Sequence, residues 1–250
     1  MRWRSRRAAA SSSARPERRP GGPPFVGGRP LYSLNVADLP FAPFRPELAD
    51  RLVAALDVEG KIARALATLG PLEGADVVLL GDAPARAAEL SAAGARVTVV
   101  PLPGGPEPVP DALVAELLDG LPEASADALV GMWSCFAAPS PRSVAAADRV
   151  LRAGGRLLVV QEYGRDDLDG VRGTDRAAEL VRWSRRDGWY LGSGFRIRVV
   201  HAFWTTGDLA EAGELLEAAF GEAGAEAAAR LRRPRVTHNV AVYHRTRPAA

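Results

Sequence analysis

Cysteine is nearly absent from this chain of 250 residues, since Cys135 is the only one. A single cysteine excludes an intrachain disulfide, and it also excludes a structural zinc site built on several cysteines. The three histidines, His201, His238 and His244, lack the spacing of a helical metal-binding motif. We therefore expect no metal site.

Long apolar runs are missing as well. No stretch of about 18 apolar residues occurs, so the sequence predicts no membrane span and no membrane partner. The N-terminus carries the positive charge of a leader sequence, but three serines interrupt its apolar middle at 8–14. A cytoplasmic protein is the default expectation, with an organelle transit peptide as the alternative to a disordered tail.

Lysine is almost absent too, because Lys61 stands beside 31 arginines. Residues 1–30 contain eight arginines and one glutamate, so the rest of the chain has a net charge of about −5. The basic character thus belongs to an Arg/Pro/Ser-rich segment that we expect to be disordered. Nucleic acid is not an expected partner of the folded part, although an RNA-associated protein using this tail and 230–235 stays open as an alternative.

Strand-like and helical patterns alternate through the middle of the chain. This alternation predicts a doubly wound α/β fold with a mostly parallel sheet. The expected strands are 76–80, 96–100, 128–133, 156–161, 195–204 and 236–245. The expected helices are 46–57, 60–69, 84–93, 111–119, 140–151, 175–187, 207–220 and 222–231, with a turn at Gly154 and Gly155.

Four segments carry a resemblance to a known family. They are 78–86, which lies where a glycine-rich first motif belongs, and 95–100, 126–134 and 149–160, the last reading RVLRAGGRLLVV. In these segments the chain resembles class I S-adenosylmethionine-dependent methyltransferases, in particular the small-molecule, type 11-like branch. The resemblance spans roughly 61–245. It implies a Rossmann-like methyltransferase domain over 31–250, an antiparallel last strand and, if the protein is active, S-adenosylmethionine as cofactor and a small-molecule acceptor.

The cofactor signature of that family is eroded here. Leu79 stands where the family has an acidic residue, and alanines replace the second and third glycines at Ala83 and Ala85. Pro101 stands where a carboxylate would accept the ribose hydroxyls. Because a hydrogen bond to a charged group contributes roughly 1.5–3 kcal/mol, these losses predict weak or absent cofactor binding. A degenerate, non-catalytic binding or interaction module is therefore the alternative function.

The spacing also predicts a shortened sheet. Only 26 residues separate Val100 from Asp127. The family fits a helix, a strand and a second helix into this interval, whereas one helical pattern is visible here. We expect about six strands, with 96–100 at or near the edge of the sheet.

Candidate site residues follow from strand ends and from the resemblance, and no catalytic residue is identified. The expected cofactor-binding residues are Gly81, Asp82, Ala83, Pro101 and Trp133, and the expected substrate-binding residues are Glu162, Tyr163 and Asp166.

Each candidate has a structural alternative. Gly81 suits a tight turn, Asp82 suits a cap for the helix that begins at Pro84, and 161–167 suits a solvated loop with internal Arg–Asp pairs. The aromatic residues of 182–195 suit a core-facing helix as well as RNA stacking, and we favour the helix.

Overall fold

The computed structural model describes residues 38–249 except 71, 103–108, 134 and 137–138. The predicted disordered tail at 1–30 lies outside these residues. So do 31–37, the first part of the segment 31–45, which its prolines predict to be an extended lead-in to the first helix.

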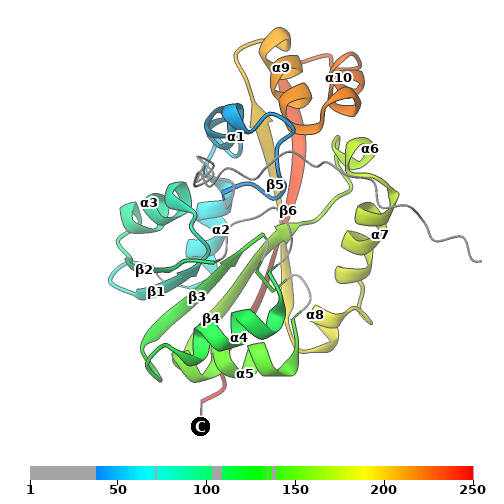
Figure 1. Ribbon diagram of the computed structural model, residues 1–250. Coiled ribbons are helices and arrows are strands. Elements are labelled where there is room, and N and C mark those ends of the chain that lie inside the picture. Colours follow the sequence, from blue (N-terminus) through cyan, green and yellow to red (C-terminus); the bar gives the residue numbers. More distant parts are fainter. Residues whose placement is uncertain (1–37, 71, 103–108, 134, 137–138, 250) are drawn as a thin grey trace, which may run out of the picture. The chain divides into compact units, whose positions relative to one another are not determined.

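Seventeen elements make up the described chain (Figure 1). The strands are β1 (Asp76–Leu80), β2 (Arg96–Val100), β3 (Ala126–Met132), β4 (Leu151–Glu162), β5 (Arg196–Thr205) and β6 (Arg235–Thr246). The helices are η2 (Pro46–Leu48), α1 (Ala49–Ala55), α2 (Lys61–Leu69), α3 (Pro84–Ala92), α4 (Asp111–Asp119), α5 (Pro141–Val150), α6 (Asp169–Arg172), α7 (Thr174–Trp183), α8 (Trp189–Gly192), α9 (Leu209–Phe220) and α10 (Glu222–Ala228).

The six strands form one sheet in the order β2-β1-β3-β4-β6-β5. Strands β2, β1, β3 and β4 are parallel, whereas β6 runs antiparallel to both β4 and β5. The predicted doubly wound α/β class with an antiparallel last strand is confirmed. Among the described residues the sheet has six strands and β2 lies at its edge, as the short interval after Val100 predicted.

Successive residues of β1 point into two different cores. Val77 and Leu79 join the core that also contains residues of α1, α2, α3 and α9. Val78 and Leu80 join the core that contains residues of α4, α5, α7 and α8. Burial on both faces explains why the parallel strands read as continuous apolar runs.

The helices on the two faces set the place where a ligand site belongs. Right-handed crossovers put α3 on one face and α4 on the other, because the chain moves outward from β1 to β2 and then back to β3. The strand order therefore reverses between β1 and β3. Ligands of open α/β sheets bind at the carboxyl ends of the strands at such a reversal, which here means next to Gly81 and Trp133.

Two element predictions are wrong in detail. Gly154 and Gly155 do not form a turn before β4. They lie inside it, where the register with β3 shifts and Arg247 exchanges backbone hydrogen bonds with both glycines. A glycine pair next to a second strand end accommodates a bulge without ending the strand. The helix expected at 175–187 ends at Trp183, and α8 begins after Gly188.

Replacing Gly224 tests the packing of α10 on α9. A Cβ at this position would overlap the Leu216 carbonyl oxygen, so Gly224→Ala should destabilise the protein by about 1–3 kcal/mol in urea unfolding. Gly213 is the matched control, since a Cβ there meets only the Ala228 Cβ at 3.7 Å. Gly213→Ala should be neutral or stabilising by up to about 1 kcal/mol, and equal losses in both variants would contradict this packing.

Candidate functional site

The first turn of α3 receives its cap from a distant residue. The carboxylate of Asp38 accepts hydrogen bonds from the backbone N–H of Ala85 at 3.0 Å and of Arg86 at 3.2 Å. Pro84, the first residue of the helix, has no N–H to donate. An N-terminal turn is a natural anion site, and in this structure an internal carboxylate occupies it.

Asp38 also links this turn to the loop after β3. Its carbonyl oxygen accepts a hydrogen bond from the Trp133 indole nitrogen at 3.1 Å. Asp38, its neighbour Leu39 and Trp133 are all buried. Burial raises the pKa of the Asp38 carboxyl, against the two backbone N–H groups that lower it. The segment before η2 therefore lies over the carboxyl ends of β1 and β3.

The predicted cofactor-binding residues follow the carboxyl ends of the adjacent strands β1, β2 and β3, but they differ in exposure. Gly81 is buried with φ +109°, and its N–H bonds to Val100. Ala83 is fully buried beneath the lead-in, whereas Asp82 and Pro101 are exposed. The expectation that Asp82 caps α3 is wrong. No side chain of its own loop caps the helix, and the Asp38 carboxylate accepts the hydrogen bonds of the first turn instead.

The loop after β3 has an unusual backbone. Trp133 has φ 44° and Phe136 has φ 53°, in the left-handed region that bulky side chains rarely occupy. Surrounding contacts hold it. The Gln161 amide donates to the Cys135 carbonyl at 2.8 Å, and the buried Tyr190 hydroxyl donates to the Phe136 carbonyl. Such strain persists only where neighbouring structure imposes it, and it is often stored at functional sites.

His238 on β6 lies between Trp133 and Glu162. The two rings stack with centroids 6.3 Å apart, and His238 is completely buried. Its Nδ1 accepts a hydrogen bond from the Trp204 indole at 3.1 Å. Its other ring nitrogen, Nε2, lies 3.7 Å from Oε1 of Glu162.

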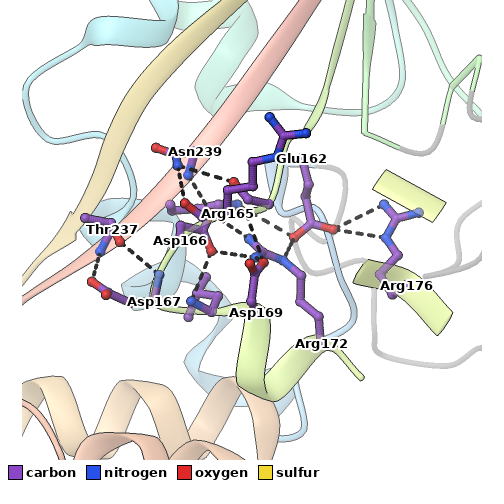
Figure 2. A network of polar contacts seen from close by, with 12 residues as sticks. Glu162, Arg165, Asp166, Asp167, Asp169, Arg172, Arg176, Thr237 and Asn239 are labelled. Atoms are coloured by element: carbon purple, nitrogen blue, oxygen red, sulfur yellow. Dashed lines mark hydrogen bonds and ion pairs between the residues drawn. The ribbon is translucent and has the colours of Figure 1, made fainter. Parts of the chain in front are cut away.

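Glu162, a predicted substrate-binding residue at the end of β4, is paired internally. Arg172 donates to its Oε1 at 2.8 Å, and Arg176 donates to its Oε2 at 3.1 Å (Figure 2). Burial alone would raise the pKa of Glu162. The His238 imidazole and the two guanidinium groups outweigh it and hold that pKa to about 2. Glu162 is thus a permanent buried anion.

Asp166 closes the loop after β4 in the same way. Its side chain is fully buried and accepts from Arg172 at 2.5 and 3.1 Å, and from the Asn239 backbone at 2.7 Å (Figure 2). The alternative of a solvated loop with internal Arg–Asp pairs is therefore wrong for Asp166, which is buried and pairs with Arg172 outside the loop. Tyr163 stands apart, and its hydroxyl accepts from Arg165 at 2.6 Å.

The structure thus joins the first turn of α3, Trp133, Glu162 and Asp166 through residues that the sequence did not single out. These linking residues are Asp38, His238, Arg172 and Arg176. A positional signal existed for the arginines, which stand four residues apart just after the acidic loop, at the end of α6 and in the first turn of α7. Asp38 had no such signal, since it lies 47 residues before Ala85.

Two other predicted groups take structural roles. Trp183 and Tyr190 are buried in the core on the α5 face, which supports the core-facing interpretation of 182–195. His201 is exposed, and its Nδ1 lies 2.8 Å from the Asn239 side-chain oxygen. Across the described ranges, no three or more His, Cys, Asp or Glu side chains are placed to hold a metal ion. None of the helices described is long and apolar enough to cross a membrane.

No protein-family model matches the chain, and no curated protein does. Solved structures do match. A protein described as a type II methyltransferase from Anaeromyxobacter dehalogenans shares 18% identity, with a TM-score of 0.47 and coverage of 76% of this chain and 96% of that one. A geranyl diphosphate methyltransferase solved with GPP and sinefungin shares 16%, with a TM-score of 0.40 and coverage of 81% and 82%. The [4+2]-cyclase SpnF shares 14%, with a TM-score of 0.36 and coverage of 82% and 84%.

Methyltransferases recur among these similar structures, and methyltransferases are also the family that the sequence resembles. The identities lie below 25% and the TM-scores below 0.5. What this chain does therefore has to be argued from its own site.

Removing the Asp38 carboxylate tests the cap of α3. Asp38→Ala should lower the free energy of unfolding by about 1–2 kcal/mol, because it leaves the N–H groups of Ala85 and Arg86 without their acceptor. Asp82→Ala removes an exposed carboxylate from the adjacent loop and should change stability by less than about 0.5 kcal/mol. Urea unfolding of both variants measures these losses. A larger loss in Asp82→Ala than in Asp38→Ala would show that Asp82 caps α3.

The Glu162 ion pairs predict a pH-dependent loss. Glu162→Gln should lower the free energy of unfolding by about 2–3 kcal/mol at pH 7. This is less than the loss expected for a buried charge left with no partner, because Arg172 still pairs with Asp166. The folded pKa of about 2 lies below the ordinary 4.5, so the stabilisation is present above pH 4.5 and is lost toward pH 2.

Urea unfolding at several pH values measures this effect. The gap between wild type and Glu162→Gln should narrow by roughly half between pH 6 and pH 3. Glu179→Gln is the control, because Glu179 pairs with Arg176 at 2.8 Å but is 36% exposed. A gap that does not depend on pH would show that Glu162 is not held as an anion.

Proposed function

We propose that this protein is a methyltransferase-fold binding module that does not use S-adenosylmethionine. The observation that carries the proposal is the Asp38 carboxylate on the backbone N–H groups of Ala85 and Arg86. It stands at the anion-accepting turn of α3, beside the loop where the family binds its cofactor. A ligand that needs this turn has to displace an internal anion first.

The free energies involved support weak or absent binding of S-adenosylmethionine. Two hydrogen bonds to a carboxylate contribute roughly 3–6 kcal/mol, while a micromolar ligand has about 8 kcal/mol of binding free energy in total. Displacing Asp38 would therefore weaken such a ligand toward millimolar affinity.

Two positions at which the family has a hydrogen-bond acceptor have none here. Leu79 is fully buried in the core, where its side chain packs instead of accepting a hydrogen bond. Pro101, after β2, is exposed and has no polar side-chain atom. The residues present thus do not fit S-adenosylmethionine in the family's usual pose, and we derive no methyl-transfer step from them.

An S-adenosylmethionine-dependent methyltransferase with a small-molecule acceptor is the second candidate. The strained backbone at Trp133 and Phe136 favours it, because strain at the carboxyl end of a strand is common in active sites. In that case Trp133 would face the cofactor and Tyr163 the acceptor. Glu162 and Asp166, already saturated by arginines, would position the loop.

Calorimetric titration with S-adenosylmethionine separates the two candidates. Wild type should bind more weakly than about 1 mM. Asp38→Ala, folded as judged by circular dichroism, should bind more tightly than wild type, because no internal anion is left to displace from the α3 turn. Binding of wild type at tens of micromolar or tighter would overturn the proposal and favour the methyltransferase.

A further inference from the structure

A basic cleft lies toward the opposite end of the strands from Asp38 and Glu162. It has a volume of about 360 Å³, within the range of small-molecule sites. The side chains that matter among those lining it are Arg156, Ser193, Arg196, His244, Arg245 and Thr246. They come from the start of β4, the turn before β5, the start of β5 and the end of β6.

Strand register brings four of these side chains together. Arg156 on β4 pairs with Thr246 on β6, and Arg196 on β5 pairs with His244 on β6. Successive side chains of a strand point to opposite faces of the sheet. In each strand these residues are an even number of positions from the buried residues that face the core containing α2, so all four side chains lie on that face. Directly opposed residues of this kind are near neighbours, and the basic groups therefore converge.

The cations in the cleft are incompletely neutralised. Arg245 pairs with Asp148 at 3.0 Å, while Arg156 donates to the Leu69 carbonyl at 2.5 Å. Arg196 is exposed, and no carboxylate of the described residues forms an ion pair with it. Two guanidinium charges thus line the cleft without a counter-ion among the described residues.

The positive charge around the cleft affects the pKa of His244. Burial lowers its pKa, and Arg156, Arg196 and Arg198 lower it further. Its imidazole is therefore neutral at pH 7 and can donate one hydrogen bond. Gathering like charges in this way is unfavourable unless an anion relieves the repulsion.

We propose that this cleft binds a small phosphomonoester, with the phosphate held by Arg156 and Arg196. Guanidinium groups match phosphate oxygens in paired hydrogen bonds. The imidazole and the hydroxyls of Ser193 and Thr246 add donors beyond those that the two oxygens of a carboxylate could use. The remaining volume accommodates an organic group. The site lies away from the α3 turn, so it holds whether or not S-adenosylmethionine binds.

Titration of the full chain at constant ionic strength tests the proposal, with inorganic phosphate and glucose 6-phosphate as probes. Wild type should bind both saturably, and glucose 6-phosphate more tightly. Arg196→Gln should weaken both by roughly tenfold or more, since a charge-assisted hydrogen bond is lost. Arg196 is exposed, so this variant should stay folded.

Arg142→Gln is the matched control. It removes the same charge from an exposed position in the first turn of α5, and Arg142 is not among the residues that line the cleft. It should leave both affinities unchanged. Equal weakening in the two variants, no saturable binding by wild type, or binding of inorganic phosphate alone would each overturn the phosphomonoester site.

Discussion

The carboxyl edge of the sheet depends on buried carboxylates that must find partners within the chain. A buried anion left unpaired costs several kcal/mol, so its position is set by whatever can neutralise it. Asp38 finds the N-terminal turn of α3, and Glu162 finds Arg172 and Arg176. Through these pairings the lead-in, the loop after β4 and α7 are all held over the strand ends.

This internal pairing changes what the fold can do. In an open α/β sheet the strand ends at the reversal point, here beside Gly81 and Trp133, are where polar groups await a ligand. Here the polar groups turn toward one another, from Asp38 through Trp133 and His238 to Glu162. At the other end of the strands, Arg156 and Arg196 line one cleft, and no carboxylate of the described residues forms an ion pair with either.

Much of the fold could be predicted because the relevant signals are local. The apolar run of β1, the helix start at Pro84 and the short interval after Val100 each depend on neighbours in sequence. They led to the right strand type, helix and strand number. The turn predicted at Gly154 and Gly155 is wrong because a glycine pair suits a turn and a bulge equally. The backbone hydrogen bonds with Arg247, on an adjoining segment, decide between the two. The helix at 175–187 failed for a similar reason, since the break at Gly188 depends on close backbone packing.

The sequence by itself determined the α/β class, the edge position of β2 and the loss of acceptors at Leu79 and Pro101. These follow from periodicity, spacing and side-chain chemistry. Only the tertiary structure decided which carboxylate meets which donor. Asp38 replaced Asp82 as the cap of α3 because a buried helix end is satisfied by whichever acceptor packing delivers, however distant in the chain. Long-range pairing of buried charge is a property of the packed molecule, and no local pattern encodes it.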